Sequence, residues 1–256
     1  MFNSIKVHKM KNLIIILPLV PLVSSGQGEK ERILFIGNSF TYYWNMPRMV
    51  EKMSEHYDLN WDVDQSTLGG AYLEQHWKGE RKLLTRELLS NGNYNHIILQ
   101  DHSTNPVLNP ENSRTFLKKF VNLSLKNNPK WYFYSTWMYP YLRQKSDHFL
   151  PINKFYKKLE TEIGHNVVEV GKVFELFRTK YPEINLLNDD DKHPSPQGSY
   201  LIACVIFTQL SNENPIGLPS RFLDNDQFDK QVIYYNIVNS KTAKKIQEFV
   251  ADYFFK

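Results

Sequence analysis

The chain has 256 residues, of which 41% are hydrophobic and 23% are charged, with a formal net charge of +4. These values are ordinary for a soluble globular protein, and the length suits one large domain with a sizeable core. The single cysteine, Cys204, excludes an internal disulfide, and it falls within an apolar helical pattern that is typical of a core thiol.

The first 26 residues are predicted to be a signal peptide and not part of the fold. Lysines precede an apolar stretch over 13–23, and small residues follow at 24–26. This order is typical of secretory signals, and the apolar stretch is too short to span a bilayer, which argues against the alternative of a membrane anchor. We therefore expect 27–256 to form a single secreted or periplasmic domain, with no stable membrane association once the signal is removed.

Removal of this leader also changes the charge of the chain. The leader carries three lysines and no acidic residue, so its loss lowers the formal net charge from +4 to +1. A nearly neutral mature chain gives no electrostatic reason to expect nucleic acid or an anionic membrane as a partner.

Short apolar runs mark the strands of the predicted fold. The run Ile33–Ile36 has no polar alternation, which is typical of a strand buried on both faces. The residues Trp61–Gln65 alternate between apolar and polar, which also indicates a strand. The five expected strands are 33–36, 61–65, 96–99, 131–136 and 167–170.

Apolar residues at helical spacing occupy the segments between these strands. Gly79 lies inside one such segment, where a glycine disfavours a continuous helix. Beyond residue 212 the pattern weakens, and we expect mixed loop over 213–238. The expected helices are 45–57, 73–88, 109–126, 152–163, 173–177, 195–210 and 240–253.

Strands that alternate with helices predict a parallel sheet covered on both faces. The expected fold is therefore a three-layer α/β/α sandwich around a five-stranded parallel sheet. Open sheets of this kind bind ligands at the carboxyl ends of their strands. The loops after the first three strands would bring Ser39, Gly70 and Gln100 to one rim of the sheet.

Ser39 follows the first strand at a place where the backbone must turn sharply. It would be a nucleophile if a base took its proton, or a simple helix cap if not. Near the other end of the chain, Asp190 precedes His193 by three residues, and one tight turn would let the carboxylate reach the imidazole. Such a pair supplies a base and an acid that fixes its tautomer, whereas the acidic run taken alone is more typical of a solvated loop. The two stretches together favour a catalytic triad.

The stretch 37–41, Gly-Asn-Ser-Phe-Thr, and the later Asp190-x-x-His193-Pro194 resemble motifs of the SGNH (GDSL-type) hydrolases. The resemblance covers about residues 33–210 and is to the DUF4886-like branch of bacterial secreted proteins. It implies a flavodoxin-like sheet order, with Ser39 as nucleophile. The order Ser, Asp, His is shared with the α/β-hydrolases, whose Gly-x-Ser-x-Gly motif is not met because residue 41 is threonine.

The resemblance also implies an oxyanion hole made of three donors. The Ser39 N–H would be one donor, and a glycine after the second strand would be another, with Gly70 as first choice and Gly69 as alternative. The family's usual Gly-x-Asn is missing after the third strand, where this chain has Gln-Asp-His-Ser. Gln100 would replace that asparagine as a neutral amide donor, and His102 is the alternative as a ring N–H donor.

Aromatic residues gather in the loops that follow the first and fourth strands. Tyr43 and Trp44 come soon after Ser39, and Trp137 and Tyr139 follow the fourth strand. They are candidates for a wall on which a sugar ring stacks. The alternative is that these side chains only pack inside the protein.

These observations predict a secreted serine esterase that needs no cofactor or metal. Its partner would be a small-molecule or glycan ester, and the resemblance suggests O-acetyl groups on carbohydrate, with acyl transfer as another outcome of the same chemistry. A catalytically weak or inactive SGNH-like protein that binds glycan is the main alternative, because Gly-x-Asn is missing. A metal hydrolase using Asp189, Asp191 and His193 has little support, since the chain has no His-x-x-x-His pair.

Overall fold

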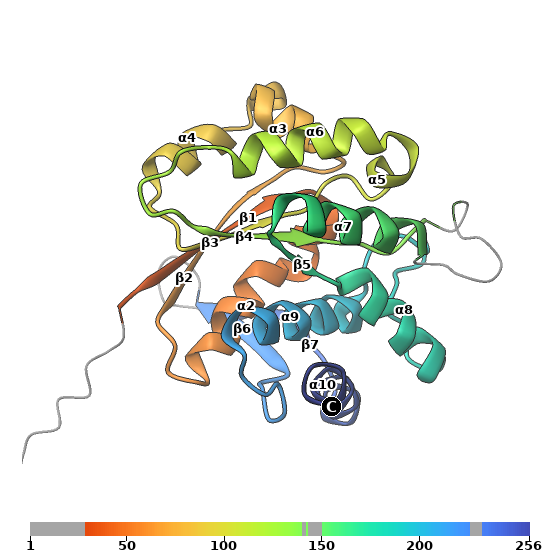
Figure 1. The fold of residues 1–256 in the computed structure, drawn as a ribbon. Helices are drawn as coiled ribbons and strands as arrows, with labels where there is room; N and C mark the ends of the chain where they lie inside the picture. The colour runs from red at the N-terminus through yellow and green to blue at the C-terminus, as the bar shows by residue number, and fades with distance from the viewer. Residues whose placement is uncertain (1–28, 140–141, 143–149, 226–231) are drawn as a thin grey trace, which may run out of the picture.

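The computed structural model describes residues 29–139, 142, 150–225 and 232–256 (Figure 1). The signal peptide predicted over 1–26 lies outside these residues and stays a prediction. Within the described part of the chain, no helix is both long enough and apolar enough to cross a membrane.

The centre of the molecule is a five-stranded sheet in the order β2-β1-β3-β4-β5, and all its neighbouring strands are parallel. This confirms the predicted sheet. Because the chain leaves β1 towards β2 and leaves β3 towards β4, the carboxyl ends of β1 and β3 flank the switch point where open α/β sheets bind ligands. The strands are β1 (Glu31–Gly37), β2 (Trp61–Thr67), β3 (His96–Leu99), β4 (Lys130–Tyr134) and β5 (Asn166–Val168).

Helices cover both faces of this sheet, as predicted (Figure 1). One layer contains α3 (Leu73–Lys78), α4 (Thr85–Asn91), α6 (Pro110–Val121) and α7 (Leu150–Ile163). The other layer contains α2 (Met46–Glu55), α8 (Val170–Lys180) and α9 (Pro196–Ser211), with α10 (Ser240–Phe255) packed against α8 and α9. The expected helix over 73–88 is divided at Gly79, whose φ is +70°.

The central strand β1 shows why its sequence is apolar without interruption. Ile33 and Phe35 join the core beneath α2, α8 and α9, while Leu34 and Ile36 join the core beneath α3, α6 and α7. Successive side chains of a strand point to opposite faces. Helices on both faces therefore require an apolar residue at every position, and all four side chains are fully buried.

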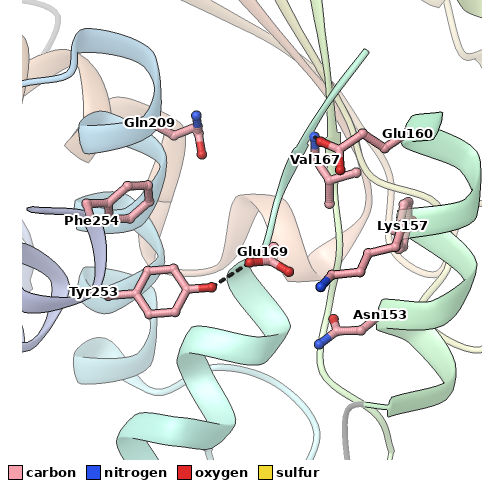
Figure 2. Close-up of a pocket in the computed structure, with 9 residues that line it drawn as sticks. Asn153, Lys157, Glu160, Val167, Glu169, Gln209, Tyr253 and Phe254 are labelled. Atoms are coloured by element: carbon pink, nitrogen blue, oxygen red, sulfur yellow. Dashed lines mark hydrogen bonds between the residues drawn. The ribbon is translucent and has the colours of Figure 1, made fainter. Parts of the chain in front are cut away.

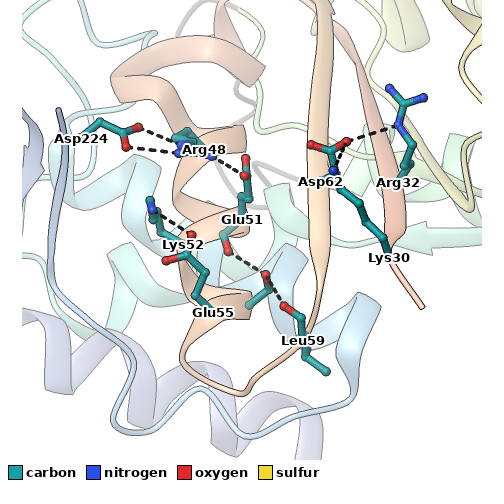
Figure 3. Close-up of polar contacts among 10 residues, drawn as sticks. Lys30, Arg32, Arg48, Glu51, Lys52, Glu55, Leu59, Asp62 and Asp224 are labelled. Carbon is teal, nitrogen blue, oxygen red and sulfur yellow. Dashed lines mark hydrogen bonds and ion pairs between the residues drawn. The ribbon is translucent and has the colours of Figure 1, made fainter. Parts of the chain in front are cut away.

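The prediction of mixed loop over 213–238 is wrong in part. This segment contains β6 (Arg221–Asn225) and β7 (Val232–Ile237), which form a separate antiparallel pair. Arg48 of α2 contacts the pair, because its Nε and Nη2 donate to the two carboxylate oxygens of Asp224 at 2.9 and 3.2 Å (Figure 3). The pair thus packs on the α2 side of the molecule.

The edge strand β5 borders a pocket of about 260 Å³ between α7, α9 and α10 (Figure 2). The Val167 N–H of β5 donates to the carboxylate of Glu160 at 3.1 Å, which occupies a donor of the open edge. On the other side of the pocket, the Tyr253 hydroxyl donates to Glu169 at 2.5 Å. None of the predicted site residues is among those that line this pocket.

Candidate active site

Ser39, His193 and Asp190 meet at the carboxyl end of β1. Ser39 begins the short helix α1 (Ser39–Tyr42) and is 8% exposed. Its Oγ lies 2.9 Å from His193 Nε2, and His193 Nδ1 lies 2.5 Å from Asp190 Oδ2. The carboxylate can only accept, so Nδ1 carries the ring proton and Nε2 is the atom that can accept the hydroxyl proton of Ser39.

The backbone of the loop before α9 directs the carboxylate of Asp190 towards His193. Asp190 Oδ1 accepts the backbone N–H groups of Lys192 and His193, each at 3.0 Å, so the carboxylate turns back over its own loop. Partial burial raises the pKa of Asp190, but the hydrogen bonds from His193 and from the Lys192 N–H outweigh it, and the pKa is lowered overall. Asp190 is therefore ionised at neutral pH.

The turn between β1 and α1 is closed by Asn38, the N-cap of α1. Its Oδ1 accepts the Phe40 N–H at 3.1 Å, and its Nδ2 donates to the Ala71 carbonyl at 3.0 Å. The Ser39 N–H is the first of the helix, so no intrahelical acceptor is available to it. It stays a candidate oxyanion donor beside the Ser39 hydroxyl.

Gln100 lies beneath this turn, and the prediction of Gln100 as an oxyanion donor is wrong. Its Oε1 accepts the Asn38 N–H and the Thr41 hydroxyl, both at 2.9 Å, and its Nε2 donates to the Asp101 carbonyl. The side chain is only 1% exposed. Its amide is therefore engaged inside the protein, away from the solvent side on which a substrate would bind.

The glycines after β2 form a tight turn. The Ala71 N–H donates to the Leu68 carbonyl at 3.0 Å, and Gly70 has a φ of +66°, which favours glycine. The Gly69 carbonyl accepts from Arg81 Nη1 at 3.1 Å. Because a trans peptide directs its C=O and N–H to opposite sides, the Gly70 N–H points away from Arg81. Gly70 keeps its place as the first candidate of the two glycines.

His102 offers a donor at the same edge of the sheet. Its ring stacks on Tyr72 with centroids 4.4 Å apart. Its Nδ1 lies 2.8 Å from the Thr104 hydroxyl and 3.4 Å from the Thr104 N–H, and in the tautomer that accepts from both groups the ring proton is on Nε2. Burial lowers the pKa of His102, and the charge of Asp101 opposes this only in part. In that tautomer, the Nε2–H is the remaining donor of the neutral ring.

Three of the four predicted aromatic residues border the triad. Tyr43 stacks on the His193 ring, with centroids 4.4 Å apart and planes 6° from parallel. Trp44 is 40% exposed, and its indole N–H donates to the Pro194 carbonyl at 3.0 Å. Tyr139 is half-buried, with its ring 5.7 Å from Phe40 and 6.0 Å from His102.

The fourth aromatic residue, Trp137, is not exposed at all, so its prediction as a substrate-binding residue is wrong. Its indole lies between the rings of Phe40 and Phe174, at 4.5 and 4.2 Å, and its N–H donates to the Lys192 carbonyl at 2.9 Å. Trp137 is thus a core residue that ties the loop of His193 to the fold.

Sequence analysis missed two buried polar residues beneath the site. His76 of α3 is fully buried, and its Nε2 lies 3.0 Å from the Gly37 carbonyl. Thr41 donates its hydroxyl to Gln100. A histidine at a core position of an amphipathic helix was the available signal for His76. Among the described residues, no group of three or more His, Cys, Asp or Glu could hold a metal ion, so Asp189 and Asp191 form no such group with His193.

Neither a family model nor a curated protein matches the chain. Solved structures do match. A candidate SGNH hydrolase from Slackia heliotrinireducens aligns with a TM-score of 0.60 and 23% identity, over 71% of this chain and 100% of that one. A DUF4886 family protein from Bacteroides uniformis aligns with a TM-score of 0.66 and 16% identity, over 88% of this chain and 94% of that one.

A psychrotrophic esterase from a Pseudoalteromonas species aligns with a TM-score of 0.54 and 11% identity, over 72% of this chain and 98% of that one. These similarities confirm the predicted fold: the chain has the SGNH hydrolase fold and resembles a DUF4886 family protein in structure.

Proposed function

We propose that this chain, which has the SGNH hydrolase fold, is a serine hydrolase that cleaves ester bonds. The observation that carries the proposal is the continuous set of hydrogen bonds from Ser39 through His193 to Asp190. A fold alone does not imply function, but a serine hydroxyl, an imidazole and a carboxylate in this order are the parts that nucleophilic acyl chemistry requires.

The reaction follows from the tautomer of His193. Its Nε2 takes the Ser39 proton while Oγ forms a bond to the ester carbonyl carbon, and the imidazolium then gives that proton to the departing alcohol as the ester C–O bond breaks. Water repeats the two proton transfers to release the acid and restore Ser39. Ionised Asp190 keeps Nδ1 protonated and stabilises the imidazolium.

Three donors are proposed for the oxyanion. They are the N–H groups of Ser39 and Gly70, with Gly69 as the alternative glycine, and the Nε2–H of His102 in place of Gln100. Losing one such donor typically costs about 3 kcal/mol of transition-state stabilisation. The support for His102 is its neutral ring, whose Nδ1 is occupied by Thr104.

The proposed substrate is a small-molecule or glycan ester, in particular an O-acetyl group on carbohydrate outside the cell. Tyr43, Trp44 and Tyr139 supply aromatic surface beside the triad, which suits a sugar ring. The predicted signal peptide supports a secreted or periplasmic location. The second candidate, a weak or inactive protein that binds glycan, would use the same aromatic surface without turnover.

The test is hydrolysis of a simple acetyl ester by the Ser39→Ala variant. Removing the nucleophile should lower kcat at least about 1,000-fold, with the remainder due to the oxyanion donors. Ser90→Ala is the matched control, because this exposed hydroxyl donates to the Arg86 carbonyl of its own helix and its loss should leave kcat unchanged. Full activity in Ser39→Ala would refute the nucleophile. Glycan binding by a wild-type chain that shows no turnover would favour the second candidate.

A further inference from the structure

We propose that Gln100 and His76 are positioning residues that hold the Gly37–Asn38 peptide and thereby fix Ser39 against His193. The inference deepens the proposed function and rests on it. Neither side chain would touch the substrate. Both act through the backbone immediately before the nucleophile.

Gln100 holds the N–H end of this peptide. Its Oε1 accepts the Asn38 N–H and the Thr41 hydroxyl, each at 2.9 Å, so one oxygen links the turn to the first turn of α1. The side chain is 1% exposed, and a buried amide is costly unless it is hydrogen-bonded. Its Nε2 donates to the Asp101 carbonyl, so the oxygen and the nitrogen of the amide both have a partner.

His76 holds the C=O end of the same peptide, together with the Leu68 N–H, which donates to the Gly37 oxygen at 3.2 Å. Its Nε2 lies 3.0 Å from the Gly37 oxygen, which can only accept, so Nε2 carries the proton. Its Nδ1 must then accept from the Thr85 hydroxyl at 2.7 Å, and Thr85 in turn accepts from the Ser66 hydroxyl at 2.7 Å. Burial lowers the pKa of His76 to about 4, which keeps this neutral arrangement at neutral pH.

A peptide bond is planar, so fixing its C=O and its N–H fixes the whole unit. The next carbonyl, that of Asn38, accepts the N–H groups of Thr41 and Tyr42 at 2.9 and 3.2 Å. The Gly37 C=O, the Asn38 N–H and the Asn38 C=O, which precede Ser39, therefore all have hydrogen-bond partners. Moving the backbone of Ser39 away from His193 requires one of these bonds to break.

Gly37 is the residue that permits this arrangement. A Cβ at this position would lie 2.5 Å from Thr41 Oγ1 and 2.6 Å from Gln100 Oε1, which is closer than real contacts allow. The glycine is needed here for close approach and not for a positive φ. The Gln100 amide therefore packs directly against the backbone at the end of β1.

The kinetic consequence is a loss of kcat with little change in KM. Displacement of a catalytic group by about 1 Å can cost about 100-fold in rate. We expect Gln100→Met, which fills the same space without an acceptor, to lower kcat by about 100-fold. Gln100→Glu keeps an acceptor oxygen for Asn38 and Thr41 and should recover most of that loss.

The Gln100→Glu variant separates a positioning role from a donor role. Burial keeps a glutamate at this position protonated, with its O–H donating to the Asp101 carbonyl where Nε2 donates in wild type. It therefore has no N–H to give to an oxyanion, and its one O–H is already used. A Gln100→Glu variant as inactive as Gln100→Met would overturn the proposal. The matched control is Gln247→Met on α10, which removes a buried glutamine with bonds to Tyr200, Gly217 and Leu218 and should leave kcat unchanged.

Backbone hydrogen exchange tests the proposal without any substrate. In Gln100→Met, peptides covering 37–42 should exchange faster than in wild type, while Gln247→Met should leave them unchanged. If wild type shows no esterase activity but this exchange difference is seen, the proposed function is refuted, while the claim that Gln100 fixes the turn before Ser39 is supported. If Gln100→Met retains full kcat in an active enzyme, or exchange over 37–42 does not change, the positioning role is refuted.

Discussion

At the scale of single residues, the orientation of the Asp190 carboxylate determines the tautomer of His193, the proposed general base. Asp190 is tied to two N–H groups of its own loop and to the ring of His193, so it cannot turn towards solvent without losing three bonds. This geometry holds the Nδ1–H tautomer, which general-base catalysis by Nε2 requires.

Replacing each aspartate of the loop by asparagine tests this assignment. Asp190→Asn should lower kcat by about 1,000-fold or more, because the amide no longer selects the required tautomer. Asp189→Asn and Asp191→Asn should stay within about threefold of wild type as exposed positions, and asparagine suits the φ of +54° at Asp191. A large loss at either neighbour, measured on one ester at one pH, would move the acid role there.

Residue type alone could not show whether an aromatic or an amide side chain contacts the substrate or packs inside the protein. Ser39, Asp190 and His193 could be named because their chemistry is specific and their spacing restrictive. Trp137 follows a strand just as a sugar-binding residue would, but Phe174 of a distant helix covers it. Gln100 likewise turns beneath Gly37. This position is open to the Gln100 side chain only because Gly37, on the neighbouring strand β1, has no Cβ.

At the scale of elements, α3 contacts the turn before Ser39 through its buried histidine. His76 is neutral in the folded chain, with a pKa lowered by burial to about 4 against about 6.5 when unfolded. Between these values the unfolded chain binds a proton that the folded chain does not. Stability from this group is therefore present above pH 6.5 and is lost as the pH falls.

The His76→Gln variant should lack this pH dependence. Between pH 7 and pH 4.5, the difference in free energy of unfolding between wild type and variant should shrink by on the order of 2 kcal/mol. Denaturant unfolding of both proteins at several pH values measures this difference. The other titrating groups are the same in both proteins, so their contributions cancel. A difference that stays constant over this range would show that His76 is protonated alike in both states.

Elements with regular periodicity could be predicted, and those with interrupted periodicity could not. The strand at 96–99 has the predicted bounds, because four buried residues lie between polar ends. The pair β6 and β7 was missed because the register shifts between Phe222 and Leu223. Such an irregularity breaks the alternation of inward and outward side chains by which a strand is recognised.

At the scale of the whole molecule, the order of strands assembles the site. The sheet brings β1 and β3 side by side, so the loops after them lie at one edge with the turn after β2. The helix α9 follows the loop of His193 and is buried along most of its length. Alternating strands and helices were sufficient to predict the layers, while contacts such as Trp137 with Lys192 depend on the folded loops.

The measurement that tests the central claim most directly is covalent labelling by a fluorophosphonate, followed by peptide mass spectrometry. An activated serine should gain one phosphonyl group per chain, located on Ser39, with or without a chelator. His193→Ala should abolish the labelling, because no base would remain to take the proton. An unlabelled wild-type chain, an adduct on another serine, or labelling that a chelator prevents would contradict a Ser39–His193–Asp190 hydrolase.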